Sequence, residues 1–210
     1  MLDWDTISAL ATGGGALVLA MATFLSVRSS NRAVRASERA LLASTLPVLA
    51  PTRLHDPPEK VRFIDDHWVK VDGGHAHVEA TGEAVYFVMS LRNVGQGLAV
   101  LDRWQIDAAG ERRDSYPDPA AFRRLTRDMY IPASDQGFWQ GALRDPADPV
   151  FAAACEAIAA HRDIVIFLLY SDQEGGQRTI SRFALTEFQG TGEWLTSVSR
   201  HWRLDQADPR

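Results

Sequence analysis

Two histidines and a glutamate form the clearest metal-ligand pattern in the sequence. His75, His77 and Glu79 are spaced two residues apart in HAHVEA, so their side chains share one face if this segment is a β-strand. A metal site needs three or four such groups converging on one point. The nearest further ligands are Asp65, Asp66 and His67. One strand face does not establish convergence, so we expect a solvated sheet face and no metal, and keep His75, His77 and Glu79 as the candidate ligands.

No compact catalytic motif accompanies these residues. The sequence lacks a GxSxG elbow, a phosphate-binding glycine loop, HExxH and paired CxxC motifs. Its single cysteine, Cys155, lies in AAACEAI, where we expect an inert thiol on the apolar side of a helix, and it excludes an intramolecular disulfide. The sequence therefore predicts no catalytic residue and no cofactor, and it leaves enzymatic activity open.

An uncharged apolar segment runs from Ile7 to Val27. As a helix, these residues would extend about 30 Å, the thickness of bilayer hydrocarbon. A cleavable export signal begins with positive residues, whereas the leader MLDWD is acidic. We expect a tail and transmembrane helix in residues 1–27, with a buried helix of a soluble fold as the alternative.

The charges beside this segment predict its orientation. Four arginines follow the apolar run and none precedes it, and Lys and Arg collect at the cytoplasmic ends of membrane helices. We expect a single-pass protein of the bacterial cytoplasmic membrane, with the N-terminus outside and the C-terminal domain in the cytoplasm. The residues expected at the membrane surface are Trp4, Arg28, Arg32, Arg35 and Arg39.

A basic amphipathic juxtamembrane helix is expected in residues 28–46, because the segment lacks Gly and Pro until Pro47. Small residues at four-residue intervals, followed by an apolar seam at seven-residue intervals, suggest contact with another helix. These positions are Ser8, Thr12, Ala16, Ala20, Val27, Val34 and Leu41. The alternative is a solvated stalk whose arginines stop translocation.

The rest of the chain is predicted to be mainly β. After a Pro-rich connection in residues 47–60, a β-sandwich is expected in residues 61–210, with one or two short inserted helices. The expected strands are 61–65, 68–72, 84–93, 98–108, 163–172, 178–188 and 194–205. Hairpins are predicted at NVGQG, with Gly95 and Gly97 available for positive φ, and at QEGGQ. A helix is expected over 148–161, capped by Asp148.

Composition narrows the class of partner. The chain has a formal net charge of −5. Residues 1–47 contain four arginines and only three acidic residues, so the negative net charge belongs to the remainder of the chain. An acidic domain argues against nucleic acid as a partner, because the phosphate backbone requires cations. Near-exclusive use of Arg over Lys is typical of a GC-rich bacterial genome.

Two turn motifs carry a resemblance. The segments LRNVGQGLAVLDRW and FLLYSDQEGGQRTISRF, after a helical stalk ending near PVLAP, resemble uncharacterised bacterial single-span membrane proteins with a C-terminal immunoglobulin-like β-sandwich. The resemblance implies an antiparallel immunoglobulin-like sandwich, and it carries no catalytic residue.

These observations favour a membrane-tethered, non-catalytic binding or scaffolding module with no cofactor. Its expected partners are the lipid bilayer and an unidentified cytoplasmic or membrane protein, with a second copy of the chain as a further option. The alternative functions are a structural subunit of a larger membrane assembly, a metal-dependent enzyme around His75 and His77, and an outward-facing domain, which the arginine distribution opposes.

Overall fold

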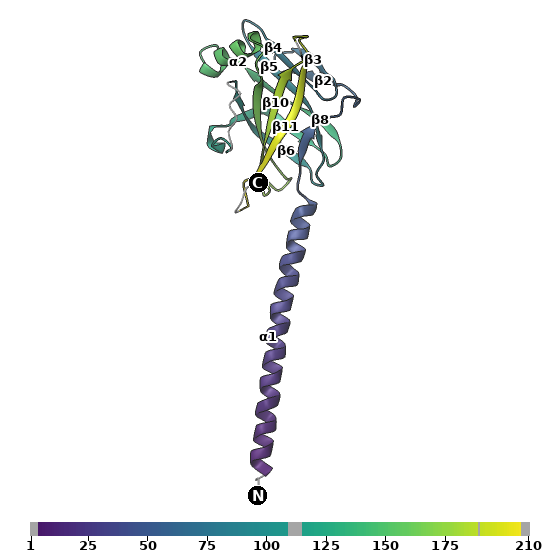
Figure 1. Cartoon of the computed structure of the whole chain (residues 1–210), viewed down its shortest axis with the longest axis vertical. Helices are drawn as coiled ribbons and strands as arrows, with labels where there is room; N and C mark the ends of the chain where they lie inside the picture. Colours follow the sequence, from purple (N-terminus) through teal and green to yellow (C-terminus); the bar gives the residue numbers. More distant parts are fainter. Residues whose placement is uncertain (1–3, 109–114, 189, 207–210) are drawn as a thin grey trace. The chain divides into compact units, whose positions relative to one another are not determined.

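A computed structural model gives the protein one long helix and a β-rich domain (Figure 1). The structure describes residues 4–108, 115–188 and 190–206, and within these ranges it leaves the side chains of residues 4–18, 39 and 43 undescribed. The chain divides into two compact units, Met1–Ser44 and Thr45–Arg210. Each unit is described by itself.

The first unit contains helix α1, Trp4–Ser44, of 41 residues. At 1.5 Å per residue it is about 60 Å long. The helix is continuous across the expected boundary between residues 27 and 28, and it ends just before Pro47, whose ring cannot continue a helix. The segment expected to be helical over residues 28–46 is helical as far as Ser44.

Within the described part of the chain, no helix combines the length and the apolar character that crossing a membrane requires. The transmembrane segment expected at Ile7–Val27 is thus not supported. The side chains of residues 7–18, including Ser8, Thr12 and Ala16, lie outside the described set, as do those of Trp4 and Arg39.

The second unit is built on a nine-stranded, curled antiparallel sheet and a separate two-stranded ribbon. The sheet order is β1-β5-β4-β11-β10-β9-β6-β7, and β8 pairs with β5 outside this path; the ribbon pairs β2 with β3. The strands are β1 Leu49–Pro51, β2 Glu59–Arg62, β3 Trp68–Val71, β4 His75–Ala80, β5 Val85–Asn93, β6 Ala99–Asp107, β7 Arg123–Ile131, β8 Gln136–Leu143, β9 Ile164–Ser171, β10 Thr179–Glu187 and β11 Trp194–Arg203. This confirms the mainly β class and is consistent with a β-sandwich.

β5 organises one end of the sheet. Along one edge it pairs with β4 through Val85–Met89 and with β1 through Leu91–Asn93, and along the other edge it pairs with β8. The curled sheet encloses the main apolar core, in which Trp104 of β6 meets Trp139 of β8 edge to face at 5.2 Å. Two strands distant along the sheet path therefore share one interior.

Local signals that the sequence carries strongly are confirmed. β9 is buried along almost its whole length, as its continuous apolar run predicts, and it forms the expected hairpin with β10. Helix α2, Pro149–Ala159, begins after Asp148, whose side chain accepts a hydrogen bond from the Val150 amide. A single 3₁₀ turn, η1 (Pro119–Ala121), also forms.

The prediction of a hairpin at NVGQG is wrong. β5 and β6 do not pair with each other; β6 instead lies between β7 and β9. Gly95 and Gly97 are not among the positive-φ glycines of the described residues. They are needed for close approach, since a Cβ on Gly95 would lie 2.3 Å from the Leu46 carbonyl oxygen and one on Gly97 would lie 1.8 Å from that of Thr45.

The sequence predicts β4 only conditionally, as the segment HAHVEA, and three further strands are absent from the sequence prediction. β1 lies within the Pro-rich segment 47–60, where Pro51 takes its last position. β7 reads RRLTRDMYI, with charged residues that hide an apolar alternation, and β8 contains two glycines, which weaken a strand signal. The neighbouring strands supply the partners that these sequences need.

Candidate functional site

A cluster of His67, His77 and Glu79 is the best candidate site in the described part of the domain. Each contributes one ligand atom, and the three atoms lie within 4.8 Å of one another. Nε2 of His67 lies 2.9 Å from Oε2 of Glu79, and Nε2 of His77 lies 3.1 Å from the same oxygen. The carboxylate therefore bridges two imidazoles.

The β4 strand provides two members of the cluster. His77 and Glu79 are two residues apart, so the pleat directs both side chains to the same face of the sheet, as the sequence predicts. Both side chains are partly exposed, His77 at 31% and Glu79 at 38%. The site is therefore open to solvent and small solutes.

The third member comes from the turn that joins β2 to β3. The His67 carbonyl accepts a hydrogen bond from the Phe63 amide at 2.9 Å, and Asp66 adopts a left-handed φ of 62°, which Asp tolerates. The apolar faces of β2 and β3 pack on β5 through Val61, Val69 and Val88. This packing holds the turn, and with it His67, over β4.

His67 is also fixed by an aromatic contact. Its ring stacks on that of Tyr86 with 4.4 Å between centroids and an interplanar angle of 23°. Tyr86 stands opposite Glu79 in the β4–β5 register. Its hydroxyl donates to Asp65 Oδ2 at 2.8 Å, and the Arg144 Nε group donates to the same oxygen at 3.1 Å. The bond to Glu79 on β4, the turn between β2 and β3, and the ring of Tyr86 thus restrict the imidazole of His67.

The pKa values of the carboxyl groups follow these contacts. Burial acts to raise the pKa of Glu79, but the hydrogen bonds from His77 and His67 outweigh it and hold this pKa below its ordinary value. Burial likewise opposes the hydrogen bonds from Tyr86 and Arg144 at Asp65, whose pKa is lowered on balance. The pKa of Tyr86 is raised, first by burial and then by its bond to Asp65. Both carboxyl groups are therefore anionic at neutral pH.

The candidate ligand set differs from the predicted one at a single position. His75 shares the strand with His77, but its Nδ1 lies 2.7 Å from the Gly73 carbonyl oxygen, and it is not part of the cluster. His67 takes its place. The sequence indicated His67 only as a neighbour, because the distance between a turn and a strand is not encoded by any residue spacing. Cys155 is half-buried on α2 and packs against the main core.

A second polar group, buried next to β1, was missed by sequence reasoning. The Tyr170 hydroxyl lies 2.9 Å from Ser181 Oγ and accepts a bond from the Leu49 amide at 3.2 Å. Ser181 Oγ also lies 2.6 Å from Nδ1 of His201. Burial, and then the charge of Arg203, lower the pKa of His201. No short motif marks this group, since its members come from three strands.

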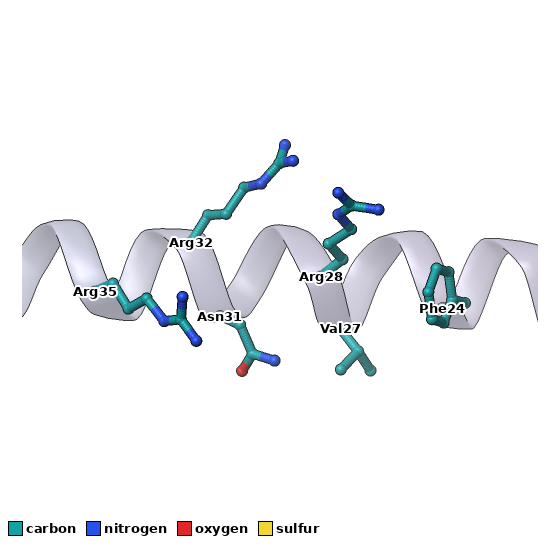
Figure 2. Close-up of a pocket in the computed structure, with 6 residues that line it drawn as sticks. All are labelled: Phe24, Val27, Arg28, Asn31, Arg32 and Arg35. Atoms are coloured by element: carbon teal, nitrogen blue, oxygen red, sulfur yellow. The ribbon is translucent and has the colours of Figure 1, made fainter.

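The described side chains of α1 form a different kind of surface. Leu19, Met21, Phe24, Leu25 and Val27 are 54–69% exposed. A shallow hollow lies along this helix from Phe24 to Arg35 (Figure 2), where Arg28 and Arg32 project to one side and Val27 and Asn31 to the other. Since one helix alone bounds the hollow, it is a surface groove.

The comparisons with known proteins add no assignment. No model of a protein family matches the chain, and none of the curated proteins compared with it is similar. The functional argument therefore depends on the residues themselves.

Proposed function

We propose that the protein is a membrane-tethered, non-catalytic binding or scaffolding module, in which α1 meets the lipid and the β-rich domain meets a partner. The observation that carries this proposal is the apolar surface of α1. Eight of the fourteen exposed large apolar side chains among the described residues belong to this helix. The apolar surface that would gain most from contact with lipid or with another protein is therefore concentrated on α1.

The sequence of α1 supports lipid as the partner of this apolar surface. Residues 7–18 extend the described apolar run without a charge, and arginines follow at Arg28, Arg32 and Arg35. An apolar segment beside a basic one matches the boundary between hydrocarbon and anionic headgroups, where each basic residue contributes about 1 kcal/mol. The arginine distribution favours a cytoplasmic domain. In its finer form, the proposal takes the curled sheet as an immunoglobulin-like sandwich.

Tethering also gives a binding domain a physical advantage. Confinement to a surface raises the effective concentration of a binding partner without adding contacts. The partner is a cytoplasmic or membrane protein, and the acidic domain disfavours nucleic acid.

The test is extraction of bacterial membranes that contain the full chain. Wild-type protein should remain in the pellet after washing with alkaline carbonate. The double variant Leu19→Asp/Phe24→Asp should be released, since each aspartate within the apolar segment costs up to about 3 kcal/mol. The matched control is Leu54→Asp/Ile64→Asp, which adds the same charges at exposed positions of the domain.

Two outcomes would contradict the tether. Wild-type protein could be recovered in the soluble fraction, or the control pair could be released as completely as the helix pair. A reporter fused after Arg210 tests the orientation separately, and activity outside the cell would overturn the cytoplasmic placement.

A structural subunit of a larger membrane assembly is the second candidate. It is favoured by Val27, Val34 and Leu41, which recur every seventh residue and are all more than half exposed. In a Cys155→Ser background, Val34→Cys should form a disulfide-linked dimer if this seam pairs two copies. Ala36→Cys, about 200° around the helix, is the control.

A further inference from the structure

We propose that His67, His77 and Glu79 bind a divalent transition-metal ion, with zinc as the ion of best fit. This site is independent of the membrane tether, because all three residues belong to the β-rich domain. It replaces the strand-face set His75, His77 and Glu79 with a set that converges in space.

The donor set matches zinc chemistry. Two imidazole nitrogens and one carboxylate oxygen form a three-ligand set that leaves a fourth, tetrahedral position for water. All-sulfur ligation is excluded by the single cysteine, and the nitrogen ligands disfavour Mg²⁺ and Ca²⁺, which prefer oxygen. The ion would therefore be one for which imidazole is a preferred ligand.

Two of the three distances between the candidate ligand atoms are close to those between the ligands of a metal ion. With metal–ligand distances of about 2.0–2.1 Å, two ligand atoms lie about 2.9 Å apart at a right angle and about 3.4 Å apart at a tetrahedral angle. The two distances to Glu79 Oε2 are 2.9 Å and 3.1 Å. The two imidazole nitrogens lie within 4.8 Å of each other, so side-chain rotations would have to bring them to about 3.4 Å to complete a tetrahedral geometry.

The surroundings of the cluster restrict its ligands before any ion arrives. The ring of His67 stacks on Tyr86, and Tyr86 is held by Asp65. Such outer contacts fix the orientation of ligating imidazoles in metal sites. His77 and Glu79 are held by the β4–β5 ladder, in which they pair with Val88 and Tyr86. Binding thus needs little ordering of the chain, which lowers its entropic cost.

The charge of the site also favours a cation. The carboxylate of Glu79 is partly shielded from water and lies between two imidazoles, which are neutral when they act as ligands. For an ion to bind, Nε2 of each imidazole must be unprotonated, so a neutral ring carries its proton on Nδ1 and a protonated ring releases one proton to solvent. The partial exposure of all three side chains leaves an entry path for the ion and room for a water ligand.

The experiment uses the full chain without a polyhistidine tag, stripped with EDTA and dialysed. Titration calorimetry with ZnCl₂ should show one ion bound per chain. The substitutions His67→Gln and His77→Gln should each weaken binding by more than about tenfold, which is the lower range for loss of an outer contact and hence a minimum for loss of a ligand. His75→Gln is the matched control on the same strand and should leave the affinity unchanged.

Cobalt gives a second measurement that does not depend on the variants folding. Co²⁺ added to the wild-type chain should produce the visible absorption bands of a low-coordinate site with nitrogen and oxygen ligands, and zinc should displace them. The proposal is overturned if neither ion binds stoichiometrically to the wild-type chain. It is also overturned if His75→Gln weakens zinc binding as much as His77→Gln does.

Discussion

Replacement of Asn93 with alanine is expected to lower the free energy of unfolding of the β-rich domain by about 4 kcal/mol. Asn93 is only 1% exposed. Its Oδ1 accepts bonds from the amides of Val48 at 3.1 Å and Gly95 at 3.0 Å. Its Nδ2 donates to the carbonyl oxygens of Gly97 at 2.6 Å and Ile131 at 3.0 Å. One side chain therefore satisfies four backbone groups from three separate segments.

The magnitude follows from these four bonds. A hydrogen bond contributes about 1 kcal/mol net, and a buried group left without a partner costs about 1–3 kcal/mol. Four lost bonds give about 4 kcal/mol, and more if water does not reach the orphaned groups. For a domain of this size, 1 kcal/mol corresponds to about 2–4 °C in the melting temperature, so a decrease of about 12 °C is expected.

Urea unfolding of the full chain, followed by tryptophan fluorescence, measures the effect, because Trp104, Trp139, Trp194 and Trp202 are buried. The matched control is Asn31→Ala, the same substitution on the exposed surface of α1, where alanine is the better helix former and no loss is expected.

A loss of less than about 1 kcal/mol in Asn93→Ala would refute the reasoning, since it would mean that the four groups find other partners. Asn93→Asp tests the two bonds that Nδ2 donates separately from the two bonds that Oδ1 accepts. It preserves the shape and the bonds to the two amides, but it turns a carboxylate oxygen toward two carbonyl oxygens. We expect this variant to be at least as destabilised as the alanine variant.

Two further substitutions test the close approach at the turn and the cap of α2. Gly97→Ala should destabilise the domain by about 1–3 kcal/mol or more, because its Cβ would lie 1.8 Å from the Thr45 carbonyl oxygen, whereas Gly82→Ala, with no atom within 4 Å, should not. Asp148→Ala should cost about 1 kcal/mol for the lost cap. Burial acts to raise the pKa of Asp148, but bonds from the Val150 amide and Arg123 lower it on balance. The stabilisation is therefore present above about pH 3.9 and is lost as the pH falls through the folded-state pKa.

Unfolding curves of these variants provide the checks. Equal stability of the Gly97 and Gly82 variants would contradict the close approach. For Asp148, the difference in unfolding free energy between wild type and Asp148→Ala should be constant near neutral pH and should shrink in acid. A difference that grows as the pH falls would contradict the sign of the pKa shift.

The elements that could be predicted from the sequence are those whose signals lie within the element itself. The second half of α1 is recognisable as a helix because residues 28–46 contain neither Gly nor Pro until Pro47, and α2 begins where Asp148 caps it. β9 is recognisable from eight successive apolar or small residues. β7 and β8 were not, because their charged and glycine residues acquire a strand conformation only from their neighbours.

The candidate site also has a part that could be predicted from the sequence and a part that could not. The alternation of β4 puts His77 and Glu79 on one face, and this was evident from the two-residue spacing. The ring of His75, on the same strand, lies outside the cluster, and its position is not encoded by any spacing. The inclusion of His67 depends on the β2–β3 ribbon folding over β5.

The sequence by itself determined the helical character of α1, the mainly β class of the domain and the buried core strand β9, since each depends on residue types and periods within a few turns of chain. Only the tertiary structure decided that β5 pairs with β1, β4 and β8 in place of β6, and that His67 joins His77 and Glu79. Strand partners and converging side chains are chosen by packing between distant segments. The free energy of this packing arises only when the core is assembled, so no local sequence pattern predicts it.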